Sequence, residues 1–351
     1  MNQDDPPPQR RVRYQGTHPR RFAEKYKELA PETHAEELEK VRARGHTPAG
    51  THRSICVTEI LEVLAPKPGE QALDATLGYG GHTQELLPLL RPGGRLVGLD
   101  VDPLELPRTE ARLRALGFGD DELVLRRMNF AGLPKVRGEF GGFDLVLADL
   151  GVSSMQIDNP TRGFTWKAEG PLDLRLNPQR GRSAAELLAS LDETALAELL
   201  VENADEPHAL AIARAVHGQP VRSTRDLANL VRTAVAGEVH VTEFEEAAKR
   251  SLQRSFQALR IAVNDEFRVL DQFLALLPAA LNPGGRVAIL TFHSGEDRRV
   301  KKAFQAGLRE GVYAAVAPEP LRASPEERRA NPRSTSAKLR WAVAPPAPGA
   351  P

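Results

Sequence analysis

The stretch LDATLGYGGHTQELLPLL, residues 73–90, decides the fold. QALDATL reads as a short apolar strand through Asp74, and the leucines that follow the glycines recur at helical spacing. Gly78, Gly80 and Gly81 let the backbone turn sharply and let a ligand approach the main chain. A strand, a glycine turn and a helix N-terminus together are typical of a cradle for an anionic or nucleotide-like ligand. The pattern G-x-G-G does not meet the dinucleotide fingerprint G-x-G-x-x-G, and a tight turn without a ligand stays open.

A second apolar strand also ends on an acid. GRLVGLDVDP, residues 94–103, places Asp100 22 positions after Gly78. An acid at the tip of the second strand can accept hydrogen bonds from both ribose hydroxyls of a nucleoside. The spacing suits NAD and S-adenosylmethionine alike, and an acid that only caps the helix start at Pro103 is the alternative. The pair predicts an adenosine-bearing ligand but no particular reaction.

Length and composition set the class of protein. With 351 residues, 41% hydrophobic and 27% charged, the chain can hold one large domain or two ordinary ones. No apolar run approaches the roughly 20 residues that span a bilayer, and the start MNQDDPPPQRRVRY lacks the apolar core of a secretory signal. Cys56 is the only cysteine, so no internal disulfide can form. We expect a cytoplasmic protein that makes no membrane contact.

The net charge of +0 hides an uneven distribution. Residues 296–340 hold 11 Lys or Arg against six acids, and residues 9–21 hold five arginines and no acid. Local basic patches can attract phosphate even when the total charge is zero. An ordinary solvated surface explains the same counts equally well.

Strand-like and helix-like stretches alternate along the chain, which predicts an α/β fold with a doubly wound parallel sheet. The strands are expected at QALDATL, RLVGLDV, ELVLRRMNF, FDLVLADLG, GRVAILTFH and SAKLRWAVA. A single helix is expected over residues 255–281. Ligands of such sheets bind at the carboxyl ends of the strands. The side chains expected at this rim are Asp74, Asp100, Phe130, Asp149 and His293.

The composition also predicts how the chain is divided. Residues 1–45 are expected to form a flexible extension, and residues 344–351 a disordered tail. Residues 46–153 and 250–343 are expected to form the sheet domain. Leu/Ala/Glu-rich helices in residues 154–249 indicate an inserted helical domain, which we expect to recognise the substrate.

Two neighbouring stretches are more specific: FDLVLADLGVSSMQID (143–158) and RGFTWKAEGPLDLRLNP (162–178). They resemble the ribosomal RNA small subunit methyltransferase H family, also named MraW. Further blocks follow the family order between residues 46 and 342: HTPAGTHRSICVTEILEVL, LDATLGYGGHT, FQALRIAVNDEF, LTFHSGEDRRVKKAF and NPRSTSAKLR. One departure is Gly295 in FHSGED, where leucine is expected; it could loosen the loop behind His293.

The resemblance implies a class I, Rossmann-like S-adenosylmethionine-dependent methyltransferase sheet with an inserted helical domain. It implies methylation of N4 of a cytidine in the decoding centre of 16S rRNA, within the small ribosomal subunit. Three alternatives stay open: an amino-methyltransferase of DNA or another RNA, a nicotinamide oxidoreductase, and a non-catalytic RNA-binding protein. The absence of HxxxH and CxxC spacings predicts no metal site, and the sequence leaves a homodimer open.

The resemblance also assigns site residues. The cofactor positions carried over, together with the first glycine of the turn, are Gly78, Gly80, Gly81, His82, Asp100, Phe130, Asp149 and Gln156. Cytosine N4 is a poor nucleophile, so positioning and a dry pocket are expected to supply most of the acceleration. Asp149, or a backbone carbonyl in residues 150–153, is the expected acceptor of an N4 hydrogen. His293 is expected to contact the base or its phosphate.

The target base must be unstacked or flipped to expose N4. Phosphate and stacking contacts are expected from Arg162, Trp166, Arg175, Arg260, Arg333, Lys338 and Arg340. Trp166 could instead pack between the two domains.

Overall fold

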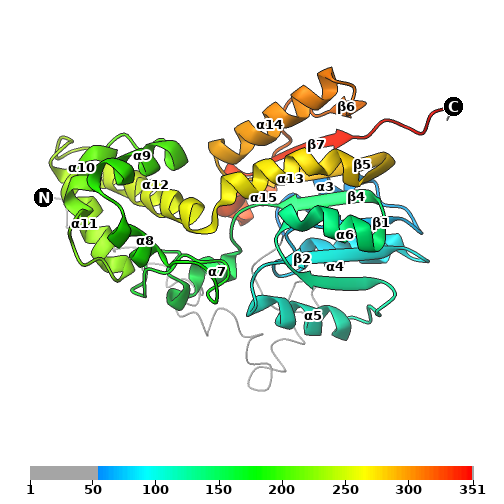
Figure 1. Ribbon diagram of the computed structural model, residues 1–351, viewed down its shortest axis with the longest axis horizontal. Coiled ribbons are helices and arrows are strands. Elements are labelled where there is room, and N and C mark those ends of the chain that lie inside the picture. Colours follow the sequence, from blue (N-terminus) through cyan, green and yellow to red (C-terminus); the bar gives the residue numbers. More distant parts are fainter. Residues whose placement is uncertain (1–53, 350–351) are drawn as a thin grey trace, which may run out of the picture. The chain divides into compact units, whose positions relative to one another are not determined.

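The computed structural model describes residues 54–349 (Figure 1). The predicted extension, residues 1–45, lies outside these residues, as do the last two residues of the predicted tail. Seven strands form one sheet in the order β3-β2-β1-β4-β5-β7-β6. They are β1 (Gln71–Asp74), β2 (Arg95–Asp100), β3 (Leu123–Arg127), β4 (Phe143–Asp149), β5 (Leu281–Thr291), β6 (Ala315–Val316) and β7 (Lys338–Val343).

The order of the strands reverses between β1 and β4. Strands β1 to β5 pair in parallel, with β1 between β2 and β4. In a doubly wound sheet, ligands bind at the carboxyl ends of the strands where the order reverses. This arrangement confirms the predicted α/β, Rossmann-like sheet. The predicted parallel pairing holds for β1 to β5, whereas β7 runs antiparallel to β5 and β6 antiparallel to β7.

Helices cover both faces of the sheet. One buried cluster joins the strands to helices α6 (Leu133–Phe140), α13 (Glu266–Ala280) and α14 (Ser294–Arg309). A second joins them to α3 (Val57–Leu64), α4 (Gly81–Leu90) and α5 (Glu105–Ala115). Strands buried on both faces are apolar along their whole length, which explains runs such as the one in β4.

Residues 154–264, here called the helical segment, pack around a third cluster of their own. That cluster runs from Phe164 to Leu259 and shares no buried residue with the other two. The helices are α7 (Ser154–Asp158), η3 (Pro160–Arg162), α8 (Ala184–Ser190), α9 (Glu193–Ala204), α10 (Ala209–Val216), α11 (Thr224–Ala236) and α12 (Phe244–Asn264). Since α12 passes the predicted limit at residue 249 without a break, the division into domains stays a prediction.

The single helix predicted over 255–281 is wrong. Asp265 has φ 54, a left-handed conformation, and it ends α12 and precedes α13. Asp and Asn tolerate this conformation better than most residues. The apolar periodicity continues on both sides of Asp265, so the break leaves only a weak trace in the sequence.

The remaining elements are short. They are η2 (Phe130–Gly132), α15 (Pro325–Ala330) and η4 (Pro332–Ser336). After β7, the N–H of Ala344 donates to the carbonyl of Gly285, and the N–H of Gly284 donates to the carbonyl of Pro345. Across residues 54–349, no helix has both the length and the apolar character that crossing a membrane requires.

Candidate cofactor and active site

The glycine loop, residues 75–80, connects β1 to α4 and is held by Asp74. The buried Asp74 carboxylate accepts hydrogen bonds from the N–H of Thr76 (3.1 Å) and from Oγ1 of Thr83 (2.7 Å). Burial raises the pKa of Asp74. At Gly80, φ is 71°, and a Cβ would lie 3.0 Å from Cγ2 of Thr109. Conformation and space therefore both favour glycine at this position, where a ligand would meet the main chain.

Asp100 joins the end of β2 to the glycine loop. Its carboxylate accepts hydrogen bonds from the N–H of Gly78 (2.7 Å) and of Asp102 (2.8 Å). Burial raises the pKa of Asp100 to about 6; the charges of Asp102 and Asp74 raise it too, while the two hydrogen bonds lower it. The structure thus brings together Gly78 and Asp100, the pair whose spacing predicted an adenosine-bearing ligand.

Asp149 ends β4 beside the same loop. Its N–H donates to Oγ1 of Thr76 (2.6 Å), and its Oδ2 lies 3.4 Å from Nε2 of His82 in the first turn of α4. Burial lowers the pKa of the buried His82, but its contact with Asp149, with smaller contributions from the charges of Asp74 and Glu327, leaves the pKa raised. The side chain of His82, one of the predicted cofactor positions, faces Asp149. Asp149 itself keeps 30% of its side chain exposed, so a ligand can reach it.

Phe130 follows β3, and Gln156 lies in α7 after β4. The ring of Phe130 packs against Phe273, with the centroids 5.0 Å apart, and is only partly buried. Oε1 of the buried Gln156 accepts from the N–H of Ser153 (2.9 Å), and its Nε2 donates to Oδ2 of Asp102 (2.9 Å). The Gln156 amide therefore already caps α7 and holds Asp102.

His293 follows β5 and precedes α14. Its Nε2 lies 3.1 Å from Oε1 of the buried Glu296, whose other oxygen accepts from the N–H of Phe292 (2.8 Å). Burial raises the pKa of Glu296, but His293, the charge of Arg260 and the N–H of Phe292 together lower it more, so the pKa ends below its ordinary value. His293 is thus part of a buried acid–base pair.

Gly295 stands where a leucine is expected, and a neighbouring ring fills the space. A Cβ at Gly295 would lie 2.5 Å from Cζ of Phe267. The Phe267 ring contacts His293, with the centroids 5.8 Å apart, and the guanidinium of Arg299 lies 3.7 Å above it. The phenylalanine therefore packs behind His293 where the glycine was expected to leave the loop loose.

Arg260 comes close to the backbone beyond Asp149. A Cβ at Gly151 would lie 3.9 Å from Nη1 of Arg260 and 3.8 Å from Cδ2 of Phe292. The guanidinium is held by Glu266 through bonds of 2.8 and 2.9 Å. Arg260 therefore lies close to Gly151, which follows Asp149 by two residues. None of the other predicted substrate contacts lies within 4 Å of the Cβ position of Gly151.

The six cations predicted to bind RNA all have a carboxylate partner within the chain. Besides Arg260–Glu266, the pairs are Arg162–Asp102 (2.7 Å), Arg175–Asp173 (2.7 Å), Arg333–Asp158 (2.8 Å), and Lys338 (2.7 Å) and Arg340 (2.6 Å) with Asp297. Arg162 and Arg340 are also buried, so their charge is not offered to a surface ligand. Trp166 packs on Phe256 in the helical segment, with the centroids 5.7 Å apart. Roles in RNA binding stay a prediction.

Three residues of the site were missed by sequence reasoning: Thr76, Asp102 and Glu296. Asp102 is fully buried. Its signal was present as the second acid of LDVDP, and that of Thr76 as the threonine after LDA. Among the described residues, Glu266, His293 and Glu296 lie close enough together to share an ion, as do Cys56, Glu59 and Glu327. The prediction of no metal site stays untested.

The MraW methylase family matches residues 49–344. The chain belongs to this family. Ribosomal RNA small subunit methyltransferase H 2 of Alkaliphilus metalliredigens is 55% identical over 340 residues, which cover 95% of this chain and 97% of the relative. Ribosomal RNA small subunit methyltransferase H 1 of Lachnoclostridium phytofermentans is 53% identical, covering 97% of this chain and 94% of the relative.

The more distant relatives align over less of the chain. Ribosomal RNA small subunit methyltransferase H of Thioalkalivibrio sulfidiphilus is 41% identical over 84% of this chain and 98% of the relative. Only seven residues follow 344, so the 95% coverage by the Alkaliphilus relative must include residues before 49. Membership of the MraW methylase family makes the chain a methyltransferase whose cofactor is S-adenosylmethionine.

Proposed function

We propose that this MraW methylase transfers a methyl group from S-adenosylmethionine to N4 of a cytidine in the decoding centre of 16S rRNA, within the small ribosomal subunit. The proposal is supported by the names of relatives up to 55% identical, which specify the small-subunit ribosomal RNA. The observation that carries it is the meeting of the glycine loop, Asp100 and Asp149 where the strand order reverses. The alternative is an amino-methyltransferase of DNA or another RNA.

The residues at this rim fit the parts of S-adenosylmethionine. The main chain at Gly80 and Gly81 opens α4, where N–H groups and the helix dipole suit the methionyl carboxylate. Asp100 would accept from the ribose hydroxyls, and the partly buried ring of Phe130 would lie beside adenine. Gln156 would support this site indirectly, because its amide donates to Asp102, whose N–H donates to Asp100. When bound, the cofactor supplies the electrophilic methyl group.

The transfer needs one bond to form as another breaks. The N4 lone pair attacks the methyl carbon, the carbon–sulfur bond breaks, and its electron pair stays on sulfur in S-adenosylhomocysteine. N4 then carries one excess proton, which leaves after the attack. Asp149 can accept a hydrogen bond from N4, which concentrates the lone pair toward the methyl group, and can then receive the proton. His82 holds the carboxylate in place through the 3.4 Å contact.

The pair of His293 and Glu296 would hold the target base from the other side of Asp149. Both residues lie just beyond β5, which pairs with β4 up to Asp149. A ring nitrogen of His293 can serve as a contact for the base or its phosphate. Arg175, Arg333 and Lys338 are part-exposed and could turn from their carboxylates to RNA phosphates.

We place the enzyme in the cytoplasm, in keeping with its buried single cysteine, and keep a homodimer as a hypothesis.

The test is methylation of purified small ribosomal subunits from cells that lack this enzyme. The subunits are incubated with the protein and isotopically labelled S-adenosylmethionine, and fragments of the 16S rRNA are mapped by mass. One methyl group on N4 of a decoding-centre cytidine is expected, with much less label on naked 16S rRNA and none on duplex DNA. Label on another base, or on the duplex, would overturn the proposal.

A further inference from the structure

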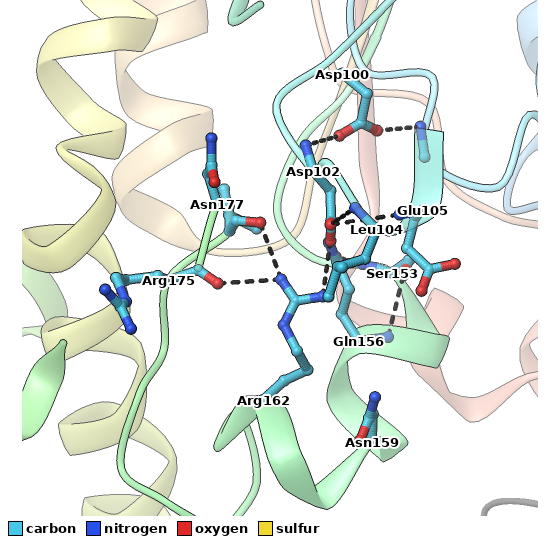
Figure 2. Close-up of polar contacts among 12 residues, drawn as sticks. Asp100, Asp102, Leu104, Glu105, Ser153, Gln156, Asn159, Arg162, Arg175 and Asn177 are labelled. Atoms are coloured by element: carbon cyan, nitrogen blue, oxygen red, sulfur yellow. Dashed lines mark hydrogen bonds and ion pairs between the residues drawn. The ribbon is translucent and has the colours of Figure 1, made fainter. Parts of the chain in front are cut away.

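Asp102 is fully buried two residues after Asp100, and all its acceptor capacity is used (Figure 2). Oδ1 accepts from the N–H of Leu104 (2.9 Å) and, more weakly, of Glu105 (3.4 Å) at the start of α5. Oδ2 accepts from Nε2 of Gln156 (2.9 Å) and Nη1 of Arg162 (2.7 Å). One carboxylate thus ties the loop after β2 to the start of the helical segment.

Arg162 continues this network away from the sheet. Its Nη2 donates to the carbonyls of Arg175 (3.1 Å) and Leu176 (2.9 Å). Figure 2 shows the bond to the Arg175 carbonyl beside the bond to Asp102. The N–H of Leu176 in turn donates to Oδ1 of Asn264, the last residue of α12 (2.7 Å). A continuous path of hydrogen bonds therefore runs from the end of β2 to the end of the helical segment.

Stability alone does not explain a pair buried this deeply. The side chain of Asp102 is 0% exposed and that of Arg162 is 5% exposed. Removing two charges from water costs several kcal/mol per ion, and replacing a buried pair by apolar residues is often neutral or stabilising. What a planar guanidinium adds is a fixed direction, because its fork binds a carboxylate and two carbonyls at set angles.

The other end of the path lies at the cofactor site. The N–H of Asp102 donates to Oδ1 of Asp100 at 2.8 Å, so the residue that receives Arg162 also orients the proposed ribose acceptor. Any shift of the Asp102 main chain would move this donor. The helical segment and the cofactor carboxylate therefore share one buried residue.

We propose that Arg162, through Asp102, is a positioning residue for methyl transfer: it fixes Asp100 and the bound cofactor relative to the helical segment. This inference rests on the proposed placement of the ribose at Asp100 and of RNA on the helical segment. In this role Arg162 acts through Asp102 and needs no contact of its own with either ligand. Its two arms have separate tasks, since the arm to Asp102 maintains the cofactor site and the arm to the carbonyls sets the helical segment against it.

The variant that separates the two arms is Arg162→Lys. A lysine ammonium can still neutralise Asp102, but it cannot also hold both carbonyls in the geometry of the fork. We expect its Kd for S-adenosylhomocysteine to stay within about twofold of the wild-type value, while kcat on small subunits falls about tenfold or more, the usual range of coupling between sites. The double variant Asp102→Asn/Arg162→Met removes both charges and is expected to weaken S-adenosylhomocysteine binding as well.

The controls distinguish positioning from folding. Thermal unfolding gives the folded fraction, and kcat is expressed per folded enzyme. Arg214→Lys changes an exposed pair with Glu193 in the same segment and is expected to leave both Kd and kcat unchanged. The inference is overturned if Arg162→Lys keeps the wild-type kcat per folded enzyme. It is also overturned if kcat falls only by as much as the affinity for S-adenosylhomocysteine falls. Asp100→Ala tests the cofactor placement separately, since unchanged S-adenosylhomocysteine affinity there would refute that placement alone.

Discussion

Nε2 of His82 lies 3.4 Å from Oδ2 of Asp149, so the first turn of α4 and the end of β4 meet through their side chains. These two elements flank the point where the strand order reverses. The contact leaves part of the Asp149 carboxylate exposed and fixes its direction. A group with an accessible oxygen and a buried partner is suited to bind an amino group and to accept its proton.

Asp149→Asn should show how much the carboxylate contributes. The amide has nearly the same shape but accepts a weaker hydrogen bond from N4 than the charged carboxylate does, so the N4 lone pair is less well directed toward the methyl group. We therefore expect kcat to fall by about tenfold, the size of one hydrogen bond to a charged group. Asp149 is also one of the predicted cofactor positions, so Kd for S-adenosylhomocysteine is measured beside kcat to separate the two roles. Single-turnover methylation of small subunits and calorimetric binding measure the two quantities. Near-normal turnover in both Asp149→Asn and Asp149→Ala would remove Asp149 from the mechanism.

The raised pKa of His82 predicts how stability depends on pH. The contact with Asp149 favours the charged ring in the folded state, so its stabilisation is full below the unfolded pKa of about 6.5. It is lost as pH rises through the higher folded pKa. The difference in unfolding free energy between wild type and His82→Asn should therefore shrink as pH rises from 5.5 to 9. Urea unfolding at several pH values measures it.

Asp149→Asn is the matched control for this pH dependence. It removes the carboxylate that raises the pKa of His82. The difference in unfolding free energy between wild type and Asp149→Asn should therefore shrink over the same pH range. A difference that grows with pH in either variant would contradict the assigned direction.

Asp100 should make cofactor binding depend on pH near 6. Burial, with the charges of Asp102 and Asp74, raises its pKa to about 6, and only the ionised carboxylate accepts from both ribose hydroxyls. We therefore expect Kd for S-adenosylhomocysteine to rise as pH falls below about 6. The same shift means that the contribution of Asp100 to stability is present below its unfolded pKa and is lost as pH rises through about 6.

Calorimetric titration between pH 5 and 8 measures this dependence. Asp100→Asn cannot ionise, so its weaker binding should be flat over the same range. If wild type and variant have parallel pH profiles, another group controls binding.

The acids at the carboxyl ends of the strands were predictable from the sequence. The carboxylate partners of the predicted RNA-binding cations were not. Asp74, Asp100 and Asp149 each close an apolar run, and the carboxyl ends of parallel strands share one rim, so their convergence follows from local pattern and topology. The burial of Arg162 depends on Asp102, which lies 60 positions away in the chain. Hydrophobic periodicity carries no information about such a pair, which is why an arginine near a tryptophan was interpreted as an RNA contact.

The polarity of the last strands was hidden for a related reason. The stretch SAKLRWAVA predicts a strand at residues 338–343, but a strand-forming stretch can pair with parallel and antiparallel neighbours alike. The break at Asp265 depends on one backbone conformation. The direction of β7 is thus set by its pairing with the distant β5, whereas the break is set by the local backbone at Asp265.

The last prediction concerns the contact between Gly295 and Phe267. A leucine at position 295 would meet the Phe267 ring, since even a Cβ there would lie 2.5 Å from Cζ. Gly295→Leu should therefore lower the unfolding free energy by about 1–3 kcal/mol, as overpacking does. Phe267→Leu in the same chain opens space for the new side chain, so the double variant should be more stable than the sum of the two single effects. Gly138→Leu is the control, because that glycine is exposed and has nothing within 4 Å of its Cβ position. Urea unfolding of the four variants completes the cycle, and strictly additive effects would show that Phe267 does not fill the space beside Gly295.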